Sequence, residues 1–267
     1  MNAAEKDRVV GASPVGASDR ESAAKAVQEM FTSIAPRYDL LNHILSFNID
    51  RLWWWRTARR FDAILKRPGA RVLDLCCGTG DMAFAVRRRV GTGDAKVLGA
   101  DFSHAMLQRA SAKGRAASAG KSGGQGETGQ APSLRWVEAD ALRLPFPDGN
   151  FDLVTSAFGF RNLADYDAGL REIARVLRPG GECGILDFGE PRGLIGEVYR
   201  LYFKKVLPAI GTLISGVRGP YAYLPASVER FPTPEEMTAR MRQAGFSEAS
   251  WTPYTMGVAG LYWGRKA

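Results

Sequence analysis

The segment from Arg71 to Asp81 constrains the fold more than any other part of the chain. Its apolar run, Val72 to Cys77, has the length of one buried strand. Gly78-Thr79-Gly80 follows, where the backbone can turn sharply and leave no side chain in the way. A helical pattern begins at Asp81. A strand, a glycine turn and a helix in this order bring a nucleotide-like ligand against backbone N–H groups, so the segment predicts a nucleotide-binding α/β domain.

Two kinds of ligand use a glycine turn of this type. The glycine spacing over residues 78–83, with the acidic Asp101 about 20 residues further on, matches a dinucleotide-binding pattern. S-adenosylmethionine has no pyrophosphate and carries instead a sulfonium cation and an amino acid head. Asp74 inside the strand and Asp81 after the turn suit those groups and would repel a pyrophosphate. The two carboxylates favour S-adenosylmethionine, although Asp81 alone also fits a residue that complements the helix dipole.

Two later segments repeat the pattern of an apolar strand that ends in an acid. Lys96 to Asp101 places a carboxylate where it can accept both ribose hydroxyls. Leu134 to Ala141 places Asp140 near the adenine amino group. Phe102 and Met106 open the helix after Asp101 and can wall the adenine.

The remaining pattern resembles the class I S-adenosylmethionine-dependent methyltransferases. Further strands are predicted at Phe151–Ser156, Glu182–Phe188, Ala249–Tyr254 and Val258–Gly264, and further helices at Ala23–Ala35, Tyr38–Phe47, Asp50–Leu65, Tyr166–Leu177 and Thr233–Ala244. Arg178-Pro-Gly-Gly is predicted to separate a helix from a strand. The resemblance implies a Rossmann-like α/β fold with a seven-stranded, mostly parallel sheet, helices on both faces, a C-terminal antiparallel hairpin and an N-terminal helical lid.

The 267 residues suffice for one domain, which we expect at residues 23–267. Its predicted parts are a disordered tail at residues 1–22, a helical lid at 23–66, a flexible insertion of low complexity at 114–133 and an apolar helical insertion on the substrate side at 193–231. The lid contains three adjacent tryptophans at residues 53–55. Because neighbours on a helix point about 100° apart, these three side chains cannot all face the core.

The chain is basic, with a formal net charge of +8. Such a balance admits nucleic acid, an anionic lipid surface or no special partner. Cys76, Cys77 and Cys183 lack metal-ligand spacing, so we expect buried cysteines in a reducing cytoplasm and no metal site. No signal-peptide or membrane-spanning pattern occurs, which predicts a cytoplasmic protein that is soluble or lies at the inner face of the cell membrane.

Motifs outside the cofactor half resemble the ubiquinone/menaquinone biosynthesis C-methyltransferases. The motifs are Phe31-x-x-Ile-Ala-x-x-Tyr38-Asp39-x-x-Asn42, Ser46-Phe47-x-Ile-x-Arg51-x-Trp53, Phe158-Gly-Phe-Arg161-Asn162-Leu, Arg175-Val-Leu-Arg-Pro-Gly-Gly181 and Tyr221-x-Tyr223-Leu-x-x-Ser227-Val-x-x-Phe231-Pro. The resemblance implies methylation of a ring carbon of a polyprenylated quinol, with S-adenosylmethionine as cofactor. Demethylmenaquinol and 2-methoxy-6-polyprenyl-1,4-benzoquinol are both compatible substrates.

The resemblance implies Arg161, Asn162, Thr79, Asp101, Asp140 and Ala141 as site residues, and residue chemistry and position add the others. The predicted catalytic residues are Arg161, Asn162, Tyr38 and His43. Arg161, helped by Asn162, would orient a water or the quinol oxygen and stabilise a developing phenolate. Alternatively, Arg161 pairs with Asp165 and holds the loop, and His43 has a structural role only. The predicted cofactor-binding residues are Asp74, Gly78, Thr79, Gly80, Asp101, Phe102, Met106, Asp140, Ala141 and Ser156, the last because a family serine is replaced by Ala157 here.

Other functions fit the residues less well. Amino-directed nucleic-acid methyltransferases place an Asn/Asp-Pro-Pro-Tyr/Phe segment after the fourth strand, where this chain has Ser156-Ala-Phe-Gly-Phe-Arg-Asn162, and we expect no nucleic acid partner. A nicotinamide dehydrogenase, which shares the glycine turn, fits less well still. A non-catalytic subunit of a quinone-biosynthesis assembly and a methyltransferase of another small molecule stay open as alternatives. The expected partners are a polyprenylated quinol, a membrane surface contacted peripherally and a second copy of the chain in a homodimer.

Overall fold

A computed structural model describes residues 11–12, 19–35, 46, 48–119, 134–189, 191 and 220–267. Its strands are β1 (Arg71–Leu75), β2 (Lys96–Asp101), β3 (Arg135–Glu138), β4 (Phe151–Ala157), β5 (Leu177–Phe188), β6 (Phe246–Tyr254) and β7 (Ala259–Lys266). Its helices are α2 (Arg20–Ile34), α4 (Ile49–Arg60), α5 (Asp62–Leu65), α6 (Asp81–Val90), α7 (His104–Ala119), α8 (Tyr166–Val176), α11 (Pro220–Arg230) and α12 (Pro234–Gln243), with short 3-10 turns η2 (Phe160–Asn162) and η4 (Thr255–Gly257).

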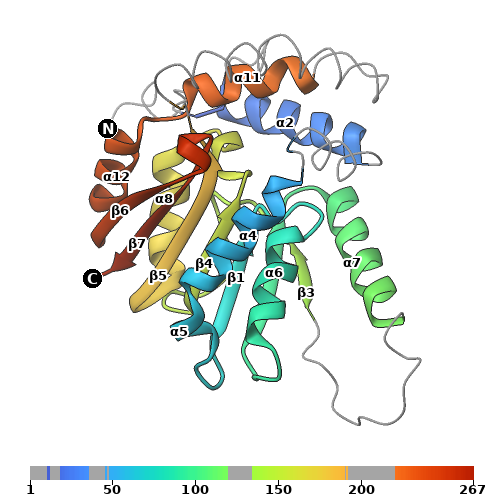
Figure 1. The fold of residues 1–267 in the computed structure, drawn as a ribbon. Coiled ribbons are helices and arrows are strands. Elements are labelled where there is room, and N and C mark those ends of the chain that lie inside the picture. The colour runs from blue at the N-terminus through green and yellow to red at the C-terminus, as the bar shows by residue number, and fades with distance from the viewer. Residues whose placement is uncertain are drawn as a thin grey trace.

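The strands form one seven-stranded sheet in the order β3-β2-β1-β4-β5-β7-β6 (Figure 1). Strands β1 to β5 pair in parallel, and β7 runs antiparallel to both β5 and β6. The predicted fold class is therefore confirmed. The chain moves outward from β1 to β3 and then returns to β4 on the other side of β1. Ligands of open α/β sheets bind at such a reversal, at the carboxyl ends of the strands.

Helices cover both faces of the sheet and enclose two apolar cores. Helices α4, α5 and α6 pack on one face, where Phe61 and Val72 are buried. Helices α8 and α12 pack on the other face, with Leu73 and Leu170. Val72 and Leu73 are neighbours in β1, and successive side chains of a strand point to opposite faces. Helices α2 and α11 lie side by side across the end of the sheet (Figure 1).

Short-range signals set the ends of several helices. Thr233 and Glu236 form the predicted capping box at the start of α12. Asp165 caps α8, because its carboxylate accepts a hydrogen bond from the Ala168 N–H at 2.9 Å. The predicted helix over Asp50–Leu65 is divided at Phe61 into α4 and α5.

The structure corrects three predicted boundaries. Helix α2 begins at Arg20, inside the predicted tail at residues 1–22, because Asp19 and Ser22 form a capping box. Helix α7 continues to Ala119, into the predicted insertion at 114–133. Strand β5 begins at Leu177 and passes through the Pro-Gly-Gly segment, since Leu177 pairs with Phe151 across a bulge.

Two predicted helical segments lie wholly or mostly outside the described residues. They are residues 38–47, of which only Ser46 is described, and residues 193–219. The described remainder of the predicted insertion at 193–231 forms α11. No helix of the described residues is long and apolar enough to cross a membrane.

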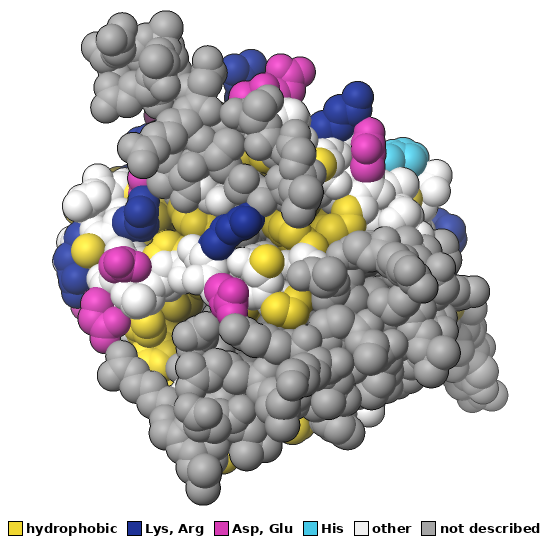
Figure 2. All heavy atoms as spheres, turned by 90° about the horizontal axis from the view of Figure 1, so that it is seen from above, with side chains coloured by type: hydrophobic (Ala, Val, Ile, Leu, Met, Phe, Trp, Pro, Cys, Tyr) yellow, Lys and Arg dark blue, Asp and Glu magenta, His cyan; other side chains and the backbone are white. Residues whose placement is uncertain are grey.

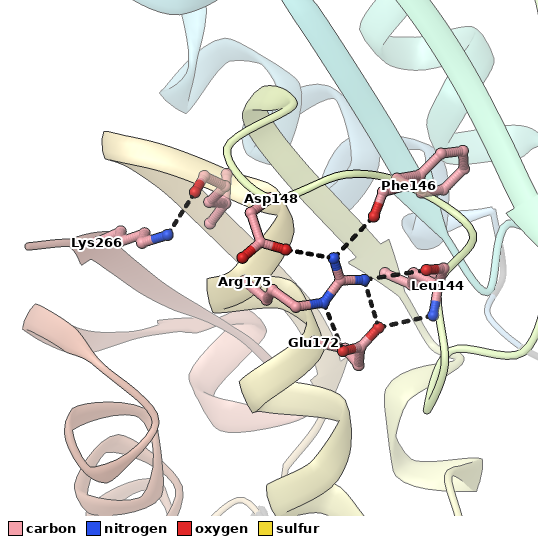
Figure 3. A network of polar contacts seen from close by, with 7 residues as sticks. Leu144, Phe146, Asp148, Glu172, Arg175 and Lys266 are labelled. Carbon is pink, nitrogen blue, oxygen red and sulfur yellow. Dashed lines mark hydrogen bonds and ion pairs between the residues drawn. The ribbon is translucent and has the colours of Figure 1, made fainter.

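Arg175 on α8 fastens the loop that leads from β3 to β4 (Figure 3). Its guanidinium donates to both carboxylate oxygens of Glu172 and to Asp148, each at 2.8 Å. It also donates to the backbone oxygens of Phe146 and Leu144, at 2.8 and 3.0 Å. Glu172 accepts the Leu144 N–H at 2.7 Å. The network therefore anchors to α8 the segment that follows the predicted adenine-binding residues.

Replacement of Arg175 by Lys should lower the free energy of unfolding by about 2 kcal/mol, because an ammonium group cannot reproduce a planar fork that binds two carboxylates and two carbonyls. Urea denaturation followed by circular dichroism measures the change. Arg171→Lys on the same helix is the matched control, since that side chain is exposed, and it should change stability by less than about 0.5 kcal/mol. Equal stability of the two variants would contradict the role of the network.

Candidate active site

A cavity of about 1030 Å³, part of it open to solvent, lies at the carboxyl ends of β1, β2 and β4. Its walls include the turn after β1 and the segments that follow β2, β3 and β4. Ala24 and Phe31 of α2 and Trp54 of α4 also line it. Segments that are far apart in the sequence thus enclose one space at the point where the strand order reverses.

The turn after β1 has a backbone that few side chains tolerate. Cys76, Gly78 and Gly80 have positive φ angles of 52°, 53° and 89°. A Cβ at Gly80 would lie 2.5 Å from the Trp136 ring, whereas nothing lies within 4 Å of a Cβ at Gly78. Gly80 is therefore required by both conformation and space, and Gly78 leaves bare backbone beside the cavity that it lines.

Asp101, at the end of β2, holds this turn in place. Its carboxylate accepts the Gly78 N–H at 2.8 Å and the Ser103 N–H at 2.9 Å. Burial raises the pKa of Asp101 from 3.8 to about 6, against the opposing effect of the backbone hydrogen bonds. The carboxylate also lines the cavity, so it can accept hydrogen bonds from a ligand.

Asp74 is fully buried in β1 and still reaches the cavity. Its Oδ1 accepts a hydrogen bond from the Thr155 hydroxyl at 2.8 Å, while Oδ2 has no partner among the described residues. Burial, with a smaller contribution from the charges of Asp101 and Asp81, raises the pKa of Asp74 from 3.8 to about 7, against the opposing effect of the hydrogen bonds from Thr155 and the Ala83 backbone. A buried carboxyl group with a free oxygen at a cavity is suited to a cation or a hydrogen-bond donor.

Asp81, the first residue of α6, has its own counter-ion. The Lys113 ammonium lies 2.7 Å from Asp81 Oδ1 and 3.2 Å from the Thr79 hydroxyl oxygen. In the part of the chain that the structure describes, neither Asp74 nor Asp101 has an ion-pair partner. These two acids therefore add uncompensated negative charge to the cavity once they ionise.

A neighbouring part of the wall suits a purine. Phe102 and Met106, at the start of α7, and Ala141 line it together with Asp140. Asp140 Oδ1 accepts the Leu142 N–H at 2.9 Å, which shapes the turn after β3. An apolar slot beside a carboxylate is the arrangement that an adenine ring with an exocyclic amino group requires.

Aromatic side chains line another part of the wall. Of the three adjacent tryptophans, Trp53 is in the core, Trp54 lines the cavity and Trp55 is 44% exposed. Phe158 also lines the cavity, and its ring centre lies 5.8 Å from that of Trp53 and 4.6 Å from that of Phe188. This wall can pack against the faces of an aromatic ligand.

Arg161 and Asn162 lie in η2, directly after β4. The Arg161 guanidinium is buried, pairs with Asp187 of β5 at 2.9 Å and lies over the Phe188 ring at 5.1 Å from its centre. It also contacts the backbone oxygen of Phe158. The predicted alternative of a pair with Asp165 is wrong, because Asp187 takes that place.

Three buried polar atoms around η2 have no hydrogen-bond partner among the described residues. They are Arg161 Nε, Asn162 Oδ1 and the hydroxyl of Tyr223 on α11, a helix that packs against η2. Burial raises the pKa of Tyr223 to about 12, so its hydroxyl stays protonated near neutrality. Because unpartnered buried donors and acceptors are costly, these three atoms indicate a ligand oxygen nearby.

The structure places most of the predicted site residues around the cavity. Those that line it are Asp74, Gly78, Thr79, Asp101, Phe102, Met106, Asp140, Ala141 and Asn162. Gly80 and Arg161 adjoin lining residues without being among them. Ser156 is a correction: it is buried in β4, and Ala157 lines the cavity instead, because successive side chains of a strand point in opposite directions. Tyr38 and His43 lie outside the described residues.

Sequence reasoning gave no role to Asp187 or Tyr223. Asp187 could have been found, because it stands near the end of a strand as Asp101 does. Tyr223 belongs to a motif named above, but nothing in that motif assigns it to this site, since only the packing of α11 against η2 brings it there.

The residues present fit S-adenosylmethionine. Asp74 and Asp101 offer carboxylates to cations and hydroxyls, and the slot beside Asp140 accommodates an adenine. No group of three or more His, Cys, Asp and Glu within the described ranges is arranged to hold a metal ion.

Fold and site together define a class I S-adenosylmethionine-dependent methyltransferase fold. A solved S-adenosylmethionine-dependent methyltransferase from Aquifex aeolicus has a TM-score of 0.52 at 17% identity, over 75% of this chain and 84% of that chain. The cyclase SpnF has a TM-score of 0.53 at 20% identity, over 78% of this chain and 80% of its own. Since a cyclase shares this fold, the fold alone does not define the reaction.

The chain belongs to the ubiE/COQ5 methyltransferase family, whose model matches residues 19–266. A demethylmenaquinone methyltransferase from Deinococcus radiodurans is 47% identical over 95% of this chain and 97% of its own. One from Thermus thermophilus is 48% identical, over 88% and 99%. A ubiquinone/menaquinone biosynthesis C-methyltransferase from Geobacter sulfurreducens is 42% identical, over 90% and 88%. The predicted family and the predicted cofactor, S-adenosylmethionine, are therefore confirmed.

Binding of S-adenosylmethionine should strengthen about tenfold between pH 5.5 and 7.5, because the cation favours ionised carboxylates and the pKa values of Asp101 and Asp74 are about 6 and about 7. Without ligand the sign is opposite. Both pKa values are raised above the unfolded value, so their contribution to stability is full below about pH 4 and is lost as the pH rises through 6 to 7.

Calorimetry across this pH range measures the affinity, and thermal unfolding of the ligand-free protein measures the stability. Asp74→Asn is the matched variant, since it keeps the shape and removes the titration. It should bind more weakly, with a flatter pH dependence. A variant with the same pH profile as the parent protein would show that Asp74 does not titrate in this range.

Proposed function

We propose that this protein transfers the methyl group of S-adenosylmethionine to a ring carbon of a polyprenylated quinol. The proposal is carried by the cavity, in which buried carboxylates and aromatic side chains share one space. The carboxylates suit a charged nucleoside, and the aromatic wall suits a quinol ring. Relatives named demethylmenaquinone methyltransferase and ubiquinone/menaquinone biosynthesis C-methyltransferase support a naphthoquinol or a benzoquinol as the acceptor.

In this proposal the acids at the strand ends hold the cofactor. Asp101 accepts hydrogen bonds from the ribose hydroxyls, and Asp140 accepts one from the adenine amino group. Asp74 faces the half of the cofactor that carries the sulfonium cation. Thr79 and the backbone of Gly78 complete the contact. When bound, the cofactor supplies a methyl group that is already electrophilic, so the protein's own task is to prepare and align the carbon that receives it.

The preparation concerns the quinol hydroxyl. Loss of its proton makes the ortho carbon more electron-rich, so a group that stabilises the phenolate favours the reaction. Arg161 cannot accept the proton, because a guanidinium has hydrogen-bond donors only and no acceptor, and it acts through its charge and its free Nε–H. Asn162 Oδ1 and the Tyr223 hydroxyl offer an acceptor and a donor to the same oxygen or to a water. Tyr38 and His43 stay predicted candidates for the proton acceptor.

The ion pair with Asp187 gives Arg161 a fixed position. Asp187 is fully buried, and its Oδ2 also accepts the Arg161 backbone N–H at 3.1 Å. Two bonds from one residue to one carboxylate hold both the turn and the side chain. Arg161 is therefore oriented before the quinol arrives, which lowers the cost of stabilising charge during the reaction.

The polyprenyl tail of the substrate also indicates where the protein would work. A tail of this kind resides in a lipid bilayer, so the protein would work by reversible peripheral contact with the inner face of the cell membrane. The homodimer that we expect is a separate prediction, which light scattering of the purified protein tests.

The double variant Arg161→Gln/Asp187→Asn should lower the methylation rate by about 100-fold, because it removes the positive charge near the developing phenolate. Binding of S-adenosylmethionine should change by less than about threefold, since the acids of the nucleoside side remain. The double variant is preferred to Arg161→Gln alone, which would leave a buried unpaired carboxylate and cost about 3 to 5 kcal/mol of stability.

Single-turnover kinetics with a reduced quinol and calorimetry with the cofactor separate these effects. Asp187→Asn alone keeps the Arg161 charge but removes the carboxylate that positions it, so its rate should lie between those of the parent protein and the double variant. Ordinary turnover in the double variant would show that Arg161 has no part in the reaction.

The quinone content of cells that lack this protein tests the function as a whole. Accumulation of demethylmenaquinone identifies the naphthoquinol as substrate, and accumulation of a demethylated benzoquinone intermediate identifies the benzoquinol. An unchanged quinone profile would contradict the proposed function.

A further inference from the structure

Helix α4 has two opposite faces, which follow from its sequence at about 100° per residue. One face spans roughly 140° and is buried: Asp50, Trp53, Trp54, Thr57 and Ala58. The opposite face spans roughly 120° and is exposed: Ile49, Leu52, Trp55, Arg56 and Arg59. A helix on the surface of a soluble domain normally has a polar outer face. The outer face of α4 is instead apolar, aromatic and basic.

The exposed large hydrophobic side chains of the described residues gather at this helix. They are Ile49, Leu52, Trp55 and Met256, with exposed fractions of 36%, 51%, 44% and 67%. The first three belong to α4 and Met256 belongs to η4, the turn between β6 and β7. The indole N–H of Trp53 donates to the Thr255 hydroxyl at 2.8 Å, which joins α4 to η4. Arg56 of the exposed face also lies over the ring of Tyr254, directly before η4, so the exposed Met256 stands on a turn that adjoins α4.

The backbone of η4 keeps Met256 outside. Thr255 and Met256 have φ angles of 46° and 55°, in the left-handed region that non-glycine residues rarely adopt. Such a conformation costs free energy, and its effect here is to expose an apolar side chain. A polar residue or a glycine would serve a solvent-exposed turn at lower cost.

Arginines surround this face. Arg51, Arg56, Arg59 and Arg60 are exposed, and within the described residues none of them forms an ion pair. The Arg56 guanidinium lies over the Tyr254 ring at 4.2 Å from its centre, and that of Arg59 lies over the Trp55 ring at 5.2 Å. Aromatic rings hold these cations at the surface without neutralising them, so an anionic partner can pair with them.

We propose that a docking surface made of Ile49, Leu52, Trp55, Met256, Arg56 and Arg59 binds an anionic phospholipid bilayer. Exposed Trp and Leu side chains enter the interface, and Arg side chains pair with lipid phosphates. The combination favours a lipid surface over a nucleic acid, because a nucleic acid would leave Leu52 and Met256 in water. Figure 2 shows the end of the molecule above the sheet, where hydrophobic side chains also reach the surface between charged ones.

The surface deepens the proposed function, and its purpose rests on that function. Trp54, one residue from Trp55 on the same helix, lines the cavity. Contact of the outer face of α4 with a bilayer therefore brings the cavity close to the membrane, where a polyprenylated quinol resides. The tail can stay in lipid while the ring enters.

Vesicle flotation with the full-length protein tests the surface. Vesicles of phosphatidylglycerol and phosphatidylcholine should carry the protein at low salt, and pure phosphatidylcholine vesicles should not. Leu52→Glu/Trp55→Glu should lower the partition coefficient by about tenfold or more. Arg56→Ala/Arg59→Ala should lower it on the order of 30-fold, with a weaker salt dependence.

Arg67→Ala/Arg88→Ala is the matched control, because both side chains are exposed, carry the same charge and belong to neither α4 nor η4. It should partition like the parent protein. All variants should bind S-adenosylmethionine with unchanged affinity, which shows that they fold. Unchanged flotation of both α4 variants would overturn the surface. The proposal would also be overturned if Leu52→Glu/Trp55→Glu separated a dimer into monomers and left flotation unchanged. In that case a second copy of the chain, and not lipid, would cover this face.

Two quinols separate this proposal from the proposed function. The α4 variants should methylate a short-chain, water-soluble quinol at the rate of the parent protein and a long-chain quinol in vesicles at least about tenfold more slowly. If the parent protein floats as expected and methylates neither quinol, the surface stands and the proposed function fails. If the variants methylate the embedded quinol as fast as the parent protein, the surface has no part in substrate delivery.

Discussion

The bond between the Gly78 N–H and the Asp101 carboxylate holds the site together. It joins the turn after β1 to the end of β2, the two strands beside which the cavity opens. The turn itself has left-handed residues at Cys76, Gly78 and Gly80, so its conformation needs support from outside the segment. Asp101 provides that support and lines the cavity with the same carboxylate. The shape of the turn and the affinity of the site are therefore both influenced by this side chain.

The buried acids of the site lower the stability of the ligand-free protein once they ionise. Asp74 and Asp101 are buried close to one another, and no cation of the described residues pairs with them, whereas Asp81 has Lys113. Burial of a carboxylate without a partner is unfavourable, and both pKa values rise accordingly. A cationic ligand offsets the cost. The uncompensated negative charge destabilises the site when it is empty. The same charge favours a sulfonium nucleoside over a pyrophosphate.

On the side of the cavity near η2, the buried group is a cation, and it has a partner within the protein. The buried Arg161–Asp187 pair is weak evidence for stability by itself, because desolvation of both ions offsets their attraction. Its effect is to hold a guanidinium with a free Nε–H near the unpartnered atoms of Asn162 and Tyr223. Such buried polar atoms are tolerated at functional sites and costly elsewhere. Helix α4 completes the arrangement, since its inner face lines the cavity and its outer face meets the surroundings.

The sequence by itself determined what neighbouring residues decide. The apolar strands that end in Asp101 and Asp140, the glycine turn and the capping box of Thr233 and Glu236 depend on residues a few positions apart, so the sequence predicts them. The predicted sheet followed from these patterns, and the predicted family followed from the longer motifs outside the cofactor half. The start of β5 was predicted too late, because Leu177 joins the sheet only through a partner strand.

The tertiary structure alone decided which distant residues meet. It paired Arg161 with Asp187 instead of the nearby Asp165, turned Trp54 toward the cavity and bonded Trp53 to Thr255. Each of these side chains has several partners that local chemistry would accept. The choice among them is made by the packing of helices on the sheet, which fixes the positions of segments far apart in the chain.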